Sequence, residues 1–88
     1  MVEYPFEERE KSSSHSVRVF KSDTDQDELK WHRDREDRIV EAVGNTDWMI
    51  QLDNELPKPI EGLVKIPRGV WHRVIKGSGD LTVRIDKL

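Results

Sequence analysis

The 88-residue sequence contains no cysteine, so it has neither a disulfide framework nor a thiolate site. Any bound metal ion would therefore be held by imidazole nitrogens and carboxylate oxygens. The sequence also lacks an apolar run of membrane-spanning length, and its first residues are polar and acidic. We therefore expect a soluble, cytoplasmic protein that has no membrane partner.

An excess of basic residues is also lacking. Fifteen lysines and arginines are set against eighteen aspartates and glutamates, which gives a formal net charge of -3. Such a chain has no net positive field that would capture a phosphate backbone, so we exclude nucleic acid as a main partner. With 34% hydrophobic and 38% charged residues, the chain can form one small domain with a thin core, which a partner chain would help to stabilise.

Residues 1–14 are rich in glutamate and serine. This composition buries too little apolar area to offset the entropy lost on ordering, so we expect a flexible N-terminal arm over residues 1–14. Tyr4 and Phe6 are the exceptions, and they are candidates for docking on the domain or on a neighbouring subunit. Residues 15–88 are expected to form a single domain.

Seven short segments after the arm alternate apolar and polar residues with a period of two, which is typical of strands. Turn-forming residues separate them, and no long stretch has helical apolar spacing. The sequence therefore predicts an all-β fold, a small antiparallel β-barrel with no helix longer than about two turns. The expected strands are Ser16–Phe20, Glu28–His32, Arg38–Val43, Asp47–Asp53, Gly62–Ile66, Val70–Ile75 and Leu81–Ile85.

Strand alternation predicts which side chains face the interior. In the last expected strand the inward residues are the apolar Leu81, Val83 and Ile85. In the strand before it, His72 lies on the same face as two valines and is expected to point inward. His32 and Asp34 share a face in the stretch "WHRDREDR", and Asp37 follows after an expected bend. Trp31, Trp71, Arg33 and Arg35 are expected to point outward.

The stretch "PRGVWH" has the form PxGxxH, with Pro67, Gly69 and His72 at its defined positions. An upstream HxD, His32 and Asp34, precedes it, and six residues separate Asp37 from Gly44. In this order and separation the chain resembles a minimal cupin over residues 29–85. Its first motif departs from the family pattern, since Asp34 replaces a histidine and Asp37 a glutamate.

The resemblance implies a double-stranded β-helix, the cupin jelly roll, and a homodimer that exchanges or extends an N-terminal strand, here Ser16–Phe20. It also implies a metal site formed by His32, Asp34, Asp37 and His72. Two imidazoles with carboxylates suit Fe, Mn, Ni or Zn. We therefore expect a cupin-like protein that binds a divalent metal ion, a small polar ligand, or both, and we assign no reaction.

Trp48, Gln51 and Arg73 are further candidates for lining the ligand pocket. An alternative has no metal: if the two aspartates pair with Arg35, Arg38 or Arg73, the barrel becomes a small-ligand-binding or protein-interaction module. Arg38 itself is expected on the outer face. The outward Trp31 and Trp71 need a cover, which either the N-terminal arm or a second subunit would supply.

Overall fold

Short segments rich in valine, isoleucine and leucine fold into antiparallel strands, because β-branched and apolar side chains suit a half-buried pleated surface. The computed structural model describes residues 4–88, and no helix in this range is long and apolar enough to cross a membrane. The strands are β1 (Glu7–Lys11), β2 (His15–Phe20), β3 (Arg38–Ala42), β4 (Met49–Leu52), β5 (Lys58–Pro59), β6 (Leu63–Ile66), β7 (His72–Ile75) and β8 (Leu81–Lys87), and the one 3₁₀ helix of this range is η1 (Gln26–Glu28).

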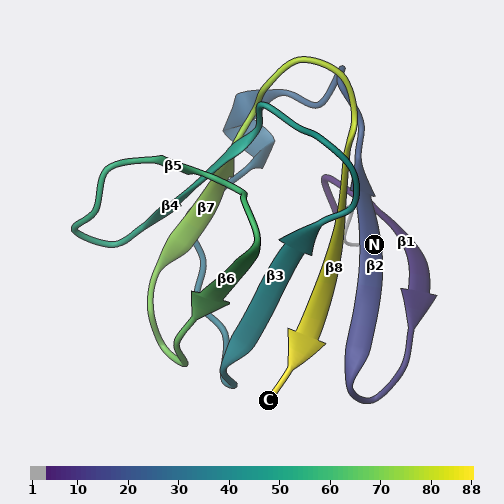
Figure 1. Cartoon of the computed structure of the whole chain (residues 1–88). Coiled ribbons are helices and arrows are strands. Elements are labelled where there is room, and N and C mark those ends of the chain that lie inside the picture. The colour runs from purple at the N-terminus through teal and green to yellow at the C-terminus, as the bar shows by residue number, and fades with distance from the viewer. Residues whose placement is uncertain (1–3) are drawn as a thin grey trace.

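The strands form a five-stranded sheet in the order β1-β2-β8-β3-β6 and a three-stranded sheet in the order β5-β4-β7. Figure 1 shows β4, β5 and β7 on the left and β3, β8, β2 and β1 on the right. This arrangement confirms the all-β, jelly-roll prediction. It corrects the expectation of a closed barrel, because the two sheets are not joined into one continuous ring of paired strands.

The core lies between the two sheets, and strand alternation determines which side chains belong to it. Leu81, Val83 and Ile85 of β8 are buried while Arg84 is exposed, as predicted. Ile85 lies opposite Val40 of β3, so the inward rows of neighbouring strands meet. The three-stranded sheet contributes the facing apolar residues, including Ile50 and Leu52 of β4. Side chains from both sheets therefore enclose the interior.

The prediction of a strand over Glu28–His32 is wrong. Residues 26–28 form η1, which begins after Asp25, whose carboxylate accepts a hydrogen bond from the backbone N–H of Asp27 at 3.0 Å. Such a cap favours a helical turn over an extended strand. Of the expected strand, His32 alone makes a β-type pairing, an isolated bridge to His72.

The expected arm contains a strand that the sequence did not predict. β1 pairs antiparallel with β2 of the same chain and forms an edge of the five-stranded sheet. All of β1 is exposed, so backbone pairing holds it in place together with Phe6, whose ring centroid lies 5.4 Å from that of Phe20. Residues 1–3 of the expected arm lie outside the described residues. Mobility of the arm on its own remains a prediction.

Removing a core side chain that lies away from the site tests this packing. Leu81 is 1% exposed, and we expect Leu81→Ala to lower the free energy of unfolding by about 2–5 kcal/mol, because it leaves a cavity. The matched control in the same strand is Arg84→Ala, which is expected to change it by less than about 0.5 kcal/mol. Urea denaturation followed by tryptophan fluorescence measures both. Equal losses for the two variants would contradict the assigned faces of β8.

Candidate metal site

Two backbone hydrogen bonds bring the halves of the site together. The N–H of His32 donates to the carbonyl of His72 at 3.0 Å, and the N–H of His72 donates to the carbonyl of His32 at 2.8 Å. Residues that exchange both bonds are direct antiparallel partners, and their side chains project to the same side of the ladder. The segment carrying His32 thereby lies along β7, whose other neighbour is β4 through the pair Leu52 and His72.

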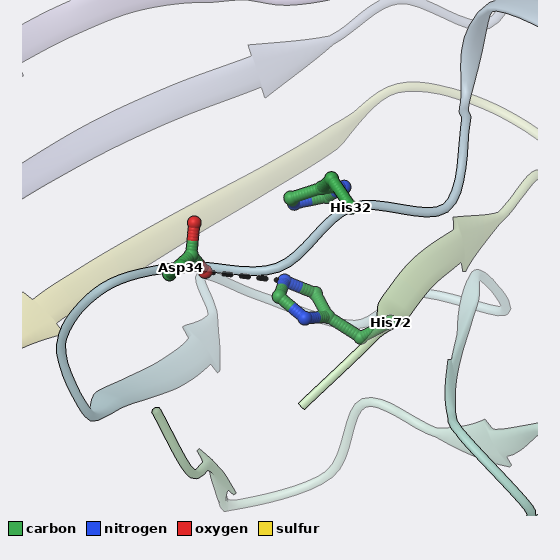
Figure 2. Close-up of side chains that lie close together, drawn as sticks. All are labelled: His32, Asp34 and His72. Carbon is green, nitrogen blue, oxygen red and sulfur yellow. Dashed lines mark ion pairs between the residues drawn. The ribbon is translucent and has the colours of Figure 1, made fainter. Parts of the chain in front are cut away.

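His32, Asp34 and His72 form a cluster at this point, and Figure 2 shows the three side chains converging. Each offers one ligand atom, and these atoms all lie within 4.8 Å of one another. The Nε2 atom of His72 lies 3.3 Å from Oδ2 of Asp34, and the two imidazole centroids lie 4.2 Å apart. His72 is 4% exposed, whereas His32 is exposed at the rim. The cluster is thus buried at one end and open at the other.

Both imidazoles are oriented by backbone carbonyls. Nδ1 of His32 lies 3.0 Å from the carbonyl of Lys30, and Nδ1 of His72 lies 2.9 Å from the carbonyl of Val70. A carbonyl can only accept, so each Nδ1 carries the proton and donates it. Nε2 of each imidazole is then the nitrogen left for a ligand, and that of His72 lies 3.3 Å from Oδ2 of Asp34. Histidines that bind a metal ion through one ring nitrogen commonly donate a hydrogen bond to a carbonyl from the other, as Nδ1 does here.

Asp34 is held by two contacts, and one of its carboxylate oxygens is left over. Its backbone carbonyl accepts from the N–H of Gly69 at 2.9 Å, where φ of +79° favours glycine. Oδ1 lies 3.3 Å from the Arg38 guanidinium. Oδ2 faces His72 and is buried, with no hydrogen-bond partner among the described residues. A buried carboxylate oxygen without a hydrogen bond is costly, so this atom marks a place for a ligand.

The position of Arg38 corrects the expectation of an outer-face charge. Its side chain is 14% exposed and pairs with Asp34 and with Glu36, the latter at 2.9 Å. The cause is the inward row of β3: Arg38 lies two residues before the buried Val40. The same pairing lowers the pKa of Glu36, chiefly through its hydrogen bond with Arg38. Arg38 is the main site residue whose direction was predicted wrongly. It lies two residues before Val40, so strand alternation would have predicted that both side chains point inward.

Asp37 does not join the cluster. Its Oδ1 accepts a hydrogen bond from the backbone N–H of Arg68 at 2.7 Å, and its backbone carbonyl accepts from Leu88 at 2.9 Å. The bend at residues 35–36 turns its carboxylate towards the loop before β7. The expectation that Asp37 is a metal ligand is therefore corrected: this side chain ties the two motif loops together.

Trp48, Gln51 and Arg73 do not line the ligand cavity either. Trp48 is fully buried in the core, where its Nε1 donates to the carbonyl of Gly79 at 3.0 Å. Gln51 lies between the inward residues of β4, so its side chain points outward and accepts from Nε of Arg73 at 3.0 Å. Arg73 follows the inward His72 and points outward for the same reason.

The outward tryptophans are partly covered by arginines of the same chain. Trp31 and Trp71 are 39% and 43% exposed, which confirms their predicted direction. The guanidinium of Arg33 lies 5.1 Å from the Trp71 ring centroid, and that of Arg73 lies 4.9 Å from the Trp31 centroid. Cation–π contacts of this length stabilise exposed aromatic rings. The N-terminal strand does not cover these rings, because β1 belongs to the other sheet.

A cavity of about 410 Å³ adjoins the cluster, and residues of both sheets line it. Its polar lining includes the three cluster residues with Arg18 and Arg38, and apolar side chains from both sheets form most of the remainder. A largely apolar pocket of this size with a few convergent polar groups is the usual form of a small-molecule site. Alternation alone did not predict it, because the cavity depends on how the side chains of both sheets pack against each other.

Comparison with known proteins places the fold. No family model and no curated protein matches the sequence. Among solved structures, a protein from Neisseria meningitidis matches with a TM-score of 0.61 at 19% identity, covering 100% of this chain and 89% of that chain. A cupin domain from Bordetella pertussis matches with a TM-score of 0.57 at 16% identity, covering 100% of this chain and 99% of that chain. The chain therefore has a cupin-like fold, with a His–His–Asp cluster that can hold a metal ion.

The burial of His72 makes stability depend on pH. Burial lowers the pKa of His72 below its ordinary value of 6.5, and the hydrogen bond with the carbonyl of Val70 offsets this in part. As the pH falls below about 6.5, the unfolded chain binds a proton that the folded chain does not. The free energy of unfolding of metal-free protein should therefore decrease between about pH 7 and pH 5.

Urea denaturation in the presence of a chelator measures this effect, and His72→Gln is the matched control because glutamine does not titrate. The stability advantage of the natural chain over His72→Gln should shrink as the pH falls. An advantage that stays constant or grows over this interval would contradict the effect of burial on His72.

Proposed function

We propose that this protein binds one divalent metal ion through His32, Asp34 and His72, and a small ligand in the adjoining cavity. The observation that carries the proposal is the buried Oδ2 of Asp34, which faces His72 and has no hydrogen-bond partner in the part of the chain that the structure describes. Nδ1 of each imidazole lies at a backbone carbonyl, which leaves Nε2 as the nitrogen available to an ion. A divalent cation is the ligand that satisfies both imidazoles and the carboxylate.

The spacing of the donors suits such an ion. Nitrogen and oxygen ligands bind these metals at about 2.0–2.2 Å, so two ligands of one ion lie at most about 4.4 Å apart. The donor atoms here lie within 4.8 Å of one another, and small side-chain rotations bring them within bonding range. Two imidazoles and one carboxylate suit Fe, Mn, Ni or Zn and leave coordination positions open.

Bound at this site, the ion would supply Lewis acidity towards an oxygen of a ligand at an open position. The residues of the chain position that ligand. Arg38 holds one oxygen of Asp34, which directs the other towards the imidazoles. His32 lies at the exposed rim, where exchange with solvent is open, and the buried His72 anchors the inner end. We assign no reaction to this arrangement.

A metal-free binding module is the second candidate, and the Arg38–Asp34 pair favours it. A carboxylate already paired at 3.3 Å with an arginine is in part neutralised, and this weakens its attraction for a cation. In this case His32 and His72 would bind a polar ligand or a partner peptide directly. The protein would then be insensitive to chelators, which separates the two candidates.

Metal titration of single variants tests the proposed site. We expect His32→Ala, Asp34→Asn and His72→Ala each to weaken Co²⁺ binding by at least about 100-fold, because each removes one of three protein ligands. Asp37→Asn is the matched control: it removes the same charge from the same stretch and keeps an oxygen that accepts from Arg68. It should bind Co²⁺ within about threefold of the natural chain.

Calorimetry and visible absorption of the Co²⁺ complex measure the affinities on chains purified without an affinity tag. If the natural chain binds no Co²⁺, and neither Zn²⁺ nor a chelator changes its melting temperature, the metal proposal is wrong and the metal-free module stands. An equal loss for Asp37→Asn and Asp34→Asn would contradict the assignment of ligands.

We also propose the homodimer that the cupin resemblance implies. The exposed side chains of Trp31, Trp71 and Leu63 support an apolar contact outside the chain. Sedimentation equilibrium should give about twice the chain mass of 10.4 kDa, and a single-chain mass at the highest attainable concentration would contradict a dimer. The cytoplasmic location likewise remains a prediction.

A further inference from the structure

The cavity restricts which molecules can lie next to the proposed ion. We infer that its ligand is a small monocarboxylate, with the carboxylate at the ion on the side of Arg38 and an apolar body between the two sheets. This inference rests on the proposed metal site and specifies the class of ligand that the site takes.

The walls of the cavity require an apolar body. Aliphatic side chains from both sheets line it, and Phe6 contributes a ring from the segment before β1. A ligand rich in hydroxyl or amide groups would lose its hydrogen bonds to water here without replacing them. The aliphatic residues that line the cavity from the strands include Val40, Ile50, Ile66, Val74, Val83 and Ile85.

The charge of the lining favours an anionic ligand. Arg18, Lys30 and Arg38 against Glu28 and Asp34 give three positive and two negative charges, a net charge of +1. Glu8 pairs with Arg18, and Glu36 with Arg38, from outside the lining. Counting these two gives three positive and four negative charges, a net charge of -1.

A divalent ion changes the balance. It raises the larger set of charges from -1 to +1, which one carboxylate neutralises and an ammonium group would worsen. A dianion would leave an excess negative charge beside Asp34 in an apolar cavity, where unpaired charge is costly. Loading with metal therefore adds two positive charges beside the cavity, which favours a carboxylate over an ammonium group.

Four probes of graded chemistry test this inference on the full chain with and without Co²⁺: hexanoate, hexanol, hexylamine and acetate. We expect hexanoate to bind the Co²⁺-loaded protein at least about tenfold more tightly than each of the other three. It should also bind at least about tenfold more tightly than it binds the metal-free protein. The apolar body should strengthen binding with each added CH₂ from acetate to hexanoate, by up to about fourfold per group.

Val83→Phe fills part of the cavity without touching the three metal ligands, and we expect it to weaken hexanoate binding at least about tenfold while Co²⁺ affinity is unchanged. Ile66→Phe, on the edge strand β6, makes the same test if Val83→Phe does not fold. Calorimetry gives the affinities, and the visible absorption of Co²⁺ reports metal occupancy separately.

The outcomes separate the two proposals. Co²⁺ binding together with equal affinity for acetate and hexanoate, or with tighter binding of hexanol or hexylamine, would overturn the monocarboxylate and leave the metal site standing. Failure of Co²⁺ to bind would overturn the metal site and this inference with it. Hexanoate binding that requires Co²⁺ and is weakened by Val83→Phe or Ile66→Phe would support both the metal site and the monocarboxylate ligand.

Discussion

The pair of backbone hydrogen bonds between His32 and His72 is the constraint on which the site depends. It fastens a segment with no regular strand of its own to the free edge of β7, and it fixes the direction of both imidazoles at once. Two further contacts secure the same loop, from the N–H groups of Arg68 and Gly69 to the side chain of Asp37 and the carbonyl of Asp34. His32 and Asp34, which lie outside the strands, are therefore held in fixed positions relative to His72 of β7.

The electrostatics of the site follow from this placement. Burial lowers the pKa of His72, and its Nε2 lies 3.3 Å from a carboxylate oxygen that has no hydrogen-bond partner among residues 4–88. Arg38 satisfies the other oxygen and is itself balanced by Glu36 on the outer side. The cluster therefore retains negative charge and free lone pairs at one point, next to an apolar cavity. This arrangement supports the proposal that the cluster binds a cation and that the cavity then takes an anionic ligand.

Period-two patterns predicted the parts of the fold where one face is apolar, such as β8, because burial fixes their register. They also placed His32, Asp34 and His72 on facing segments. They failed where a local hydrogen bond or a bend determines the backbone conformation. The Asp25 cap favours η1 over the expected strand. The bend before Asp37 turns the Asp37 carboxylate away from the cluster. The strand β1 was missed because backbone pairing and not apolar burial stabilises it. The inward Arg38 was not predicted, although it lies two residues before the buried Val40 and therefore on the same face of β3.

The central claim is that one metal ion is bound by these three side chains, and an anomalous difference map from crystals grown with Co²⁺ tests it most directly. The account predicts one strong peak per chain, at about 2.0–2.2 Å from Nε2 of His32, Nε2 of His72 and a carboxylate oxygen of Asp34. A peak at Asp37, a peak elsewhere on the surface, or no peak at the cluster while Arg38 still pairs with Asp34 would contradict it.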